Sequence, residues 1–392
     1  MSPPERSAAA APLGVNGRFL LGIGRGTGVH RVAWNWLRSL AATAPGDRRF
    51  IVAAPSTPEN APVLDSLRSL DRVEVVPAAI RGRAAAHLWE QTRMPSILRA
   101  RGCAALLNLA NTMPLRPRMP SLLAVMDVSF LERAEWFGAR FRWLYRLLLP
   151  ACMRRASRLV TISEFSRREI IRRLGIPAER IDVVPLGIDH APLTLPPVAV
   201  PREGPAWQPP ARPYILSVGT LEPRKNIPLL IEAYRMLRER APGLPHALLL
   251  AGGTEDIYTR ERLAAVGGVH LLGYLSESDL DACYRQADLF VYPSLYEGFG
   301  LPPLEAMARG TATAVSRAGA LPEAVGEGAV LFDPGSAQEL SCLLERLLGD
   351  PMELQLLAKK GLERAGALKW ESAGRRFNQI LDGWLGAAGA QQ

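Results

Sequence analysis

Two carboxylates in the C-terminal half have the spacing of a site for a sugar joined to a phosphate. Glu297 and Glu305 stand eight positions apart in the segment PSLYEGFGLPPLEAMARG (293–310). Carboxylate oxygens accept hydrogen bonds from hydroxyl groups, and glycines let the backbone approach a ligand closely. A helix predicted to begin at Pro302 or Pro303, with Glu305 in its first turn, would present N–H groups to a phosphate. The segment therefore indicates a nucleotide-sugar site, although a capping carboxylate is the alternative for Glu305 alone.

A pair of cations lies in the segment SVGTLEPRKNIPLLIEAY (217–234), between a predicted strand and a helix expected from about Ile227. Arg224 and Lys225 follow Gly219 at the carboxyl end of that strand, where they could clamp a diphosphate. A solvated surface pair is the alternative interpretation. Lys225 is one of four lysines in a chain that otherwise uses arginine, which favours the functional one.

The elements that must position these residues are strands alternating with helices, the pattern of parallel α/β sheets. One helix is predicted over residues 164–174, with Ser163 as its N-cap and Gly175 just beyond its end. Strands are expected at residues 17–22, 48–54, 73–77, 104–110, 121–127 and 158–163, and then at 214–220, 246–253, 269–275, 288–294 and 328–334.

The chain divides near its middle, where residues 191–213 contain eight prolines. Proline removes backbone donors and disfavours helix in the residue before it, so an extended linker is expected. The predicted parts are domain 1–195, linker 196–213, domain 214–370 and a C-terminal helix 371–392 that crosses back to the first domain. Two Rossmann-like parallel sheets would then face each other across a cleft, and ligands of such sheets bind at their carboxyl edges.

Taken together, the motifs resemble the retaining glycosyltransferases of family 4, which have the GT-B fold. The resemblance rests on GTLEPRKN, LLGYLSESDL, ADLFVYPSLYEGFGLPPLEAMA and ALPEAVGEGAVLFDP in the second half. In the first half it rests on TGVHRVAWNWLRSL, LLNLANTMPL and LVTISEFSRREIIRRLGIPAERIDVVPLGID. It extends from about residue 15 to about residue 385 and is strongest to the bacterial branch that builds polysaccharides, which includes mannosyltransferases.

The resemblance implies roles at matching positions. Glu305 would bind the nucleotide ribose, Glu297 would contact the transferred sugar or support its anomeric carbon, and Arg224 and Lys225 would stabilise the departing nucleoside diphosphate. Stabilisation of the leaving group by fixed charges is the expected catalytic effect. No metal and no cofactor besides the donor substrate are implied. Gly273, Tyr274 and Leu275 lie where the family holds the base. The other implied donor-binding residues are Gly28, Gly219, Gly298, Phe299, Gly300 and Leu301.

One position departs from the family pattern. Where the family usually has His-Asp, at the end of the strand SLLAVMD, this chain has Met126 and Asp127. A thioether cannot replace the hydrogen bond of an imidazole N–H. The departure implies an unusual donor, a catalytic arrangement that uses Asp127, or weakened activity. A non-catalytic subunit that binds nucleotide sugars is therefore the alternative from another functional class.

Charge is distributed unequally along the chain, whose net charge is +9. Residues 1–200 carry a net +13 and residues 201–392 a net −4. Residues 133–173 hold 11 arginines against three glutamates, with aromatic rings interleaved. Such a segment is expected at an anionic membrane surface, and the alternative is a core helix with a solvated arginine face. No nucleic-acid-binding motif accompanies the charge, so a nucleic-acid partner is not expected.

The remaining features predict a protein of the cytoplasm, peripheral on the inner face of the cytoplasmic membrane. Composition is that of a globular chain, and the four cysteines form no CxxC or disulfide framework. Neither a signal peptide nor a membrane span is expected. The resemblance to the polysaccharide-building branch, and nothing else in the sequence, implies GDP-mannose as the donor, with UDP-glucose or another nucleotide hexose as the alternative. The predicted acceptor is a glycan, lipid-linked or free.

Overall fold

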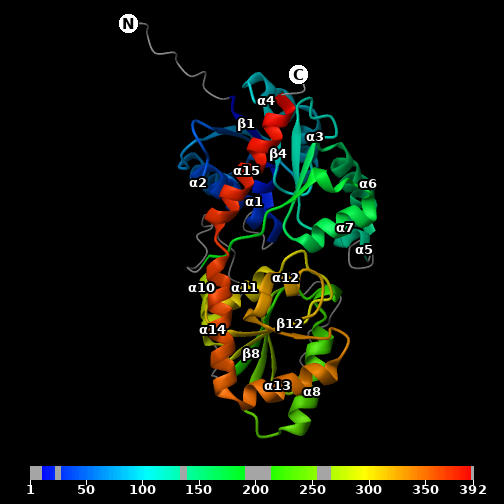
Figure 1. Ribbon diagram of the computed structural model, residues 1–392, viewed down its shortest axis with the longest axis vertical. Coiled ribbons are helices and arrows are strands. Elements are labelled where there is room, and N and C mark those ends of the chain that lie inside the picture. The colour runs from blue at the N-terminus through cyan, green and yellow to red at the C-terminus, as the bar shows by residue number, and fades with distance from the viewer. Residues whose placement is uncertain (1–10, 23–27, 133–138, 190–212, 254–265, 390–392) are drawn as a thin grey trace.

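The computed structural model describes residues 11–22, 28–132, 139–189, 213–253 and 266–389. Figure 1 shows two sheet-and-helix units stacked along the long axis of the molecule, the N-terminal half above the C-terminal half. The predicted linker at 196–213 lies outside the described residues except for Pro213, as do the aromatic rings Trp136 and Phe137.

The N-terminal half contains a seven-stranded sheet in which every described strand pair is parallel. Its strand order is β3-β2-β1-β4-β5-β6-β7. Strands β1, β2, β4 and β5 are buried on both faces, which accounts for their largely apolar sequences, whereas the edge strand β3 is half-buried. The strands are β1 (Leu13–Asn16), β2 (Phe50–Ser56), β3 (Val73–Ala79), β4 (Ala105–Asn108), β5 (Ser121–Val125), β6 (Arg158–Thr161) and β7 (Ile181–Val183).

The C-terminal half repeats this plan with six parallel strands in the order β10-β9-β8-β11-β12-β13. In both sheets the strand order reverses direction once, between β1 and β4 and between β8 and β11. Loops leaving the carboxyl ends of strands at such a reversal diverge and leave room for a ligand. The strands are β8 (Tyr214–Val218), β9 (Ala247–Ala251), β10 (Val269–Gly273), β11 (Leu289–Tyr292), β12 (Ala312–Ser316) and β13 (Val330–Phe332).

Helices connect these parallel strands. The α-helices of the first half are α1 (Gly28–Ala42), α2 (Ala61–Arg68), α3 (Arg83–Thr92), α4 (Met94–Ala100), α5 (Ser129–Glu132), α6 (Ala139–Arg155) and α7 (Glu164–Leu174). Those that follow are α8 (Ile227–Arg240), α10 (Glu277–Gln286), α11 (Leu301–Ala308), α12 (Leu321–Val325), α13 (Ala337–Gly349), α14 (Pro351–Ala367) and α15 (Trp370–Gly389). Short 3-10 turns are η1 (Gly17–Gly22), η2 (Pro58–Asn60), η4 (Ala178–Arg180), η5 (Pro223–Lys225) and η6 (Gly326–Gly328).

The predicted capping of α7 is confirmed. Ser163 lies in extended backbone and its side chain accepts a hydrogen bond from the N–H of Ser166, while Gly175 ends the helix in the left-handed conformation. The start of α8 at Ile227 is also as predicted. Most of the expected strands lie where the sequence placed them, and most are two to four residues shorter than expected.

The strand predicted over residues 17–22 is wrong. The first strand is β1, which pairs with β2 from Leu13 to Asn16, and residues 17–22 form the 3-10 turn η1. The side-chain oxygen of Asn16 accepts a hydrogen bond from the N–H of Arg18, which turns the chain out of the strand. Phe19 and Leu20 are nevertheless buried, and a short buried apolar run does not by itself distinguish a strand from a turn of helix.

Two strands were not predicted. β12 has the sequence ATAVS, whose small and hydroxylated residues give little strand signal, although all five residues are buried. β7 has only three residues. β12 pairs with β11 on one side and β13 on the other, and β7 pairs with β6 at the edge of its sheet, so their pairing partners decide their conformation.

The C-terminal helix α15 packs on the N-terminal half, against α1 (Figure 1). The ring of Phe377 meets that of Trp36 edge to face, with centroids 5.4 Å apart. The amide of Asn378 donates to the carbonyl of Leu40 at 3.1 Å and accepts from Arg48 at 2.8 Å. Residues about 340 positions apart therefore share one core.

We expect Phe377→Ala to lower the free energy of unfolding by about 3–5 kcal/mol, because it removes a fully buried ring from this core. Urea denaturation followed by circular dichroism measures the change. Arg376→Ala, at an exposed position of the same helix, should change stability by only about 0.5 kcal/mol. Equal effects of the two substitutions would show that α15 contributes no core to the N-terminal half.

Candidate functional site

The carboxylate of Glu297 lies where donors from the ends of β8 and β11 converge. Its Oε1 accepts hydrogen bonds from Lys225 Nζ at 2.7 Å, Ser294 Oγ at 2.7 Å and the Tyr292 hydroxyl at 3.1 Å. Arg224 Nη1 lies 3.0 Å from the same oxygen. All four contacts fall on Oε1, so they fix the carboxylate while Oε2 receives none of them.

Electrostatics keeps this buried carboxylate ionised. Burial by itself would raise the pKa of Glu297, but the charges of Arg224 and Lys225 and the hydrogen bonds from Lys225 and Ser294 lower it to about 2. Burial and the neighbouring Arg224 lower the pKa of Lys225, and Glu297 opposes that change. With both cations protonated the three side chains carry a net charge of +1, which favours an anionic ligand.

Backbone contacts hold the two loops that supply this group together. The N–H of Leu295 donates to the carbonyl of Arg224 at 2.8 Å, and Arg224 Nη1 donates to the carbonyl of Tyr296 at 3.0 Å. The turn η5 is thereby joined to the loop that follows β11. The basic pair and Glu297, about 70 positions apart in sequence, form one unit.

A third loop supports Glu297 from behind. The N–H of Ala320 donates to the carbonyl of Glu297 at 2.9 Å. Gly319 adopts a φ of +60°, and a Cβ at this position would lie 2.6 Å from the Glu297 carbonyl oxygen. Only glycine fits at this point, because both the backbone conformation and the contact exclude a side chain.

Glu305 lies in α11 and has partners different from those of Glu297. Its Oε2 accepts a hydrogen bond from the Tyr284 hydroxyl at 2.9 Å, and its Oε1 forms an ion pair with Arg31 of the N-terminal half. The predicted position in the first helical turn is wrong, because α11 begins at Leu301, before both prolines, and so places Glu305 in the second turn.

The residues predicted to hold the base lie along the carboxyl edge of β8, β9 and β10. The N–H of Gly219 donates to the carbonyl of Ala251, and the N–H of Gly252 donates to that of Gly273. Tyr274 is 68% exposed, and its ring lies over Gly253, where a Cβ would come within 2.2 Å of it. Leu275 is half-buried beside this ring. The edge thus offers an exposed aromatic face.

Gly28 is the first residue of α1, in the N-terminal half, opposite the C-terminal sheet. It is exposed, and no atom lies within 4 Å of the place a Cβ would take. The adjacent segment 23–27 lies outside the described residues. Because Arg31, one turn further along α1, reaches Glu305, the first turn of this helix faces α11.

Gly298 is packed against the N-terminal half. A Cβ on Gly298 would lie 2.7 Å from the carbonyl oxygen of Met126 and 2.9 Å from Cβ of Asp127. The carbonyl of Gly298 accepts a hydrogen bond from Ser163 Oγ at 2.7 Å. This glycine therefore permits close contact between the two halves. Gly300 follows as the N-cap of α11, with a φ of +105°.

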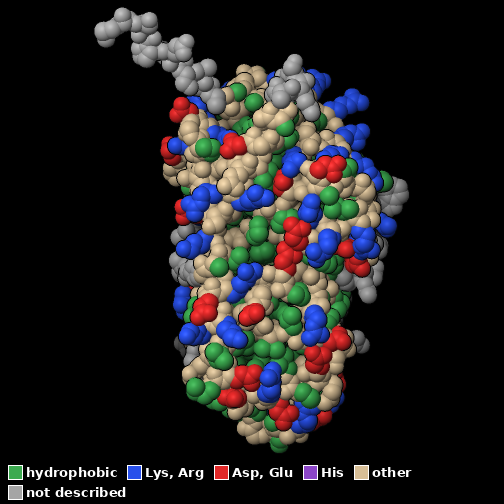
Figure 2. Space-filling view, in the orientation of Figure 1, with side chains coloured by type: hydrophobic (Ala, Val, Ile, Leu, Met, Phe, Trp, Pro, Cys, Tyr) green, Lys and Arg blue, Asp and Glu red, His purple; other side chains and the backbone are tan. Residues whose placement is uncertain are grey.

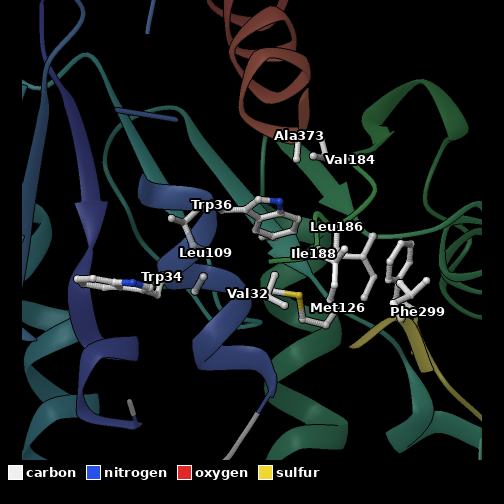
Figure 3. Close-up of a cluster of buried hydrophobic side chains, with 14 of the residues drawn as sticks. Val32, Trp34, Trp36, Leu109, Met126, Val184, Leu186, Ile188, Phe299 and Ala373 are labelled. Atoms are coloured by element: carbon white, nitrogen blue, oxygen red, sulfur yellow. The ribbon is translucent and has the colours of Figure 1, made fainter. Parts of the chain in front are cut away.

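Met126 belongs to an apolar cluster at this contact. Figure 3 shows its thioether beside Val32 and Ile188, with Phe299 of the C-terminal half closing the same cluster. Met126 and Phe299 are each only 4% exposed. The family's imidazole position is thus filled by an apolar side chain whose surroundings are also apolar. Leu301 packs against the same core.

Asp127 caps the short helix α5. Its Oδ1 accepts hydrogen bonds from the backbone N–H of Ser129 at 2.9 Å and from the Ser129 hydroxyl at 2.6 Å. Its charge contributes to the raised pKa of Arg224, so it lies within electrostatic reach of the basic pair. The structure gives Asp127 a structural contact and leaves its predicted catalytic role as a prediction.

The N-terminal half has a buried polar group of its own where the strand order reverses at β1 and β4. Glu90 is completely buried, accepts from Asn16 at 2.6 Å and forms an ion pair with Arg18 at 3.0 Å. Burial would raise the pKa of Glu90, but its contacts with His87, Arg18 and Asn16 lower it. Thr112 Oγ1 donates to the same carboxylate at 3.2 Å. The group fixes the half-buried Arg18 and His87.

Sequence reasoning missed several residues of this arrangement. Tyr292 and Ser294 end a predicted strand just before Glu297, a position at which polar side chains face the ligand edge, so that signal was available. Tyr284 and Arg31 carry no such signal, because their contact with Glu305 exists only once α10, α11 and α1 have packed together.

Comparison with known proteins gives matches for both halves. The family model described as Glycosyltransferase Family 4 matches residues 26–191, and the model described as Glycosyl transferases group 1 matches residues 206–364. The chain is 37% identical over 257 residues to O-antigen chain mannosyltransferase B of Escherichia coli. It is also 37% identical over 227 residues to the MMP alpha-(1->4)-mannosyltransferase of Mycolicibacterium hassiacum.

These matches cover 63% and 56% of the chain, and 66% and 52% of the two relatives, so the chain spans less than two thirds of either relative's length. Solved structures agree in fold. The sucrose-phosphate synthase of Thermosynechococcus elongatus superposes with a TM-score of 0.68 at 19% identity, covering 96% of this chain and all of that one. Anabaena HepE in complex with UDP and glucose gives 0.65 at 18%, covering 95% and 100%. The two halves together therefore have the GT-B architecture.

We expect the stability of the fold to depend on pH through Glu297. Its folded pKa of about 2 lies below the ordinary value of 4.5, so ionisation stabilises the fold above pH 4.5 and this stabilisation is lost as the pH falls toward 2. The full contribution is about 3 kcal/mol, of which about 2 kcal/mol should disappear between pH 5 and pH 3.

Urea unfolding at these two pH values measures the change. Glu297→Gln should reduce the loss of stability by this amount, whereas Glu363→Gln, at an exposed position of α14, should leave it as in the wild type. If Glu297→Gln unfolds with the same pH dependence as the wild type, the carboxylate is not held ionised by its neighbours.

Proposed function

The chain belongs to glycosyltransferase family 4, and from this premise we propose that it transfers a hexose from a nucleotide sugar to a glycan with retention of anomeric configuration. One observation carries the proposal. Arg224 and Lys225 converge on a single oxygen of Glu297 at the reversal point of the second sheet, where ligands of such sheets bind. The group combines a net positive charge for a diphosphate with a carboxylate oxygen for a hydroxyl.

The chemistry follows from fixed charges. Breaking the bond between the sugar and the nucleotide leaves negative charge on the departing diphosphate, and preformed cations stabilise that charge without reorganising. Arg224 and Lys225 are already oriented by Glu297, Tyr292 and the carbonyl of Tyr296. In this proposal Oε2 of Glu297 accepts from the transferred sugar, and Glu305 accepts from the ribose hydroxyls.

GDP-mannose is the proposed donor. The names of both curated relatives describe mannosyltransferases, which supports mannose as the transferred sugar. UDP-glucose is the second candidate, since HepE, which shares the fold, was solved with UDP and glucose. The exposed ring of Tyr274 at the predicted base position could stack on a purine or a pyrimidine, so it favours neither.

The proposed acceptor is a lipid-linked oligosaccharide of a cell-surface polysaccharide. The relation to an O-antigen chain mannosyltransferase supports this class of product. In the N-terminal half, Arg18 and His87 are held by the buried Glu90 at the carboxyl edge of β1 and β4. The ion pair of Arg18 with Glu90 is neutral overall, which suits the hydroxyl groups of a neutral sugar.

Met126 favours one alternative function, that of a non-catalytic subunit that binds nucleotide sugars. Its thioether offers no strong donor or acceptor to a sugar and instead lies in the apolar cluster that also contains Phe299 (Figure 3). The intact contacts of Glu297, Arg224 and Lys225 favour catalysis, because a binding protein has no leaving group to stabilise.

A panel of nucleotide sugars tests the proposal. We expect GDP to raise the unfolding temperature more than UDP, and we expect mannose transfer from GDP-mannose. Glu297→Ala should lower turnover at least about 100-fold, because it removes the carboxylate that orients both cations. Glu363→Ala, on the exposed face of α14, should retain full turnover.

Two results would contradict parts of this proposal. Selective stabilisation by UDP would exclude GDP-mannose as the donor. Binding of a nucleotide sugar without transfer or hydrolysis of any donor in the panel would support the non-catalytic subunit.

We further propose that α6 and the start of α7 bind to the anionic inner face of the cytoplasmic membrane. Figure 2 shows basic side chains, which are all arginine in this part of the chain, along the margin of the upper half where Figure 1 places these helices. Arg146, Arg154 and Arg155 are exposed, and Leu147 between them is 64% exposed. Among the described residues, no helix is long and apolar enough to cross a membrane.

Only some of the arginines in this region carry free charge. Arg172 and Arg173 share Glu169, and Arg158 forms a double contact with Asp182. Among the described side chains of this region, Arg146, Arg154 and Arg155 of α6 and Arg168 of α7 are exposed and form no ion pair with an acidic side chain, so their charge is available to a membrane.

Sedimentation with phosphatidylglycerol and phosphatidylcholine vesicles measures this interaction. Replacing Arg146, Arg154 and Arg155 together with glutamine should weaken binding to the anionic vesicles at least about tenfold, at about 1 kcal/mol for each charge. The matched control replaces Arg346, Lys359 and Lys360, three exposed cations of the C-terminal half, and should bind as the wild type does. Equal binding by all three proteins would refute the membrane surface on α6.

A further inference from the structure

Arg31 connects the two halves at the residue predicted to hold the ribose. It lies near the start of α1, and its guanidinium forms an ion pair with Oε1 of Glu305 in α11. The two side chains are only 20% and 5% exposed. Since Tyr284 donates to Oε2, both oxygens of Glu305 are engaged, one from each half of the molecule.

The ion pair leaves hydrogen-bonding capacity unused. Nε of Arg31 and Oε1 of Glu305 are both buried atoms without an aligned hydrogen-bond partner among the residues the structure describes. A buried donor or acceptor without a partner is costly, so a ligand that supplies partners would be bound favourably at this point.

Arg31 also faces a locally acidic surface of the second half. Burial raises the pKa of Glu277, in the first turn of α10, and the charge of Arg31 lowers it in part. The other nearby cation, Arg309, is engaged by Asp281 at 2.9 Å. Arg31 is therefore the cation whose removal would leave Glu305 and Glu277 unbalanced.

We propose that Arg31 is a donor-binding residue supplied by the N-terminal half, one that exchanges Glu305 for the donor's diphosphate. Ribose hydroxyls donate to Oε1 of Glu305 in place of the guanidinium. The guanidinium, still largely buried, then requires another anion, and the diphosphate attached to that ribose brings one within reach of its long side chain. This inference rests on the proposed function.

A different prediction for phosphate binding follows if Arg31 is a simple latch, that is, a side chain that pairs with Glu305 and never contacts the donor. A latch would only compete with the ribose, so its removal would strengthen nucleoside and nucleoside diphosphate binding equally. An exchange lets Arg31 contribute to the diphosphate complex, so its removal weakens that complex selectively. The informative quantity is the ratio of the affinity for GDP to that for guanosine, and likewise for UDP and uridine.

Isothermal titration calorimetry of the full chain with these four compounds provides the test. Arg31→Gln should lower the affinity ratio of diphosphate to nucleoside at least about tenfold, since a charge-assisted contact to phosphate is lost. Arg38→Gln, two turns further along α1, is the matched control and should keep the wild-type ratio. Unfolding temperatures of the three proteins show whether they are equally folded.

Each other result counts against the inference. An unchanged ratio in Arg31→Gln, with both affinities raised, would identify a latch. An unchanged ratio with unaltered affinities would show that Arg31 does not reach the donor. If the wild type binds neither diphosphate, the proposed function itself fails and the inference falls with it, whereas binding by the wild type with an unchanged ratio refutes the inference alone.

Discussion

An ionised carboxylate inside a protein needs compensating charge, and the arrangement around Glu297 follows from that need. Burial of Glu297 is possible because Arg224 and Lys225 lower its pKa and because Ser294 and Tyr292 donate to the same oxygen. These partners come from the loops after β8 and β11, which must therefore lie side by side. The parallel sheet brings those loops together, and the carboxylate in turn fixes the two cations.

The contact between the two halves is built around the residues that the donor is proposed to use. Gly298 touches Met126 and Asp127, and Phe299 joins the apolar cluster of the N-terminal half. Next to them, Glu323 of α12 accepts hydrogen bonds from the first two N–H groups of α7, at 2.8 and 3.0 Å. A ligand bound at Glu297 or Glu305 would therefore lie beside the contact between the two halves.

Charge is used differently in the two halves. The C-terminal half is net acidic, yet it places two cations where a phosphate is expected, so a local positive field does not require an excess of basic residues. In the N-terminal half many arginines are paired with acidic side chains, as Arg158 is with Asp182. Among the side chains of α6 that the structure describes, Arg146, Arg154 and Arg155 are exposed.

The sequence by itself determined the class of fold and the local groups. Apolar runs located most strands, Ser163 and Gly175 bounded α7, and Glu297, Arg224 and Lys225 could be chosen as a set because each lies within a short segment of distinctive composition. These signals are local, arising from residues a few positions apart. The short apolar run at residues 17–22 was misread because local hydrophobicity does not tell a strand from a buried turn.

Only the tertiary structure decided which distant residues meet. Arg31 and Glu305 are 274 positions apart, Ser163 and Gly298 are 135 apart, and Trp36 and Phe377 are 341 apart. Nothing in the neighbourhood of Arg31 distinguishes it from the other arginines of the chain, because its partner is set by the packing of α1 on α11. The same holds for Met126, whose apolar cluster combines Val32 and Ile188 of its own half with Phe299 of the other half.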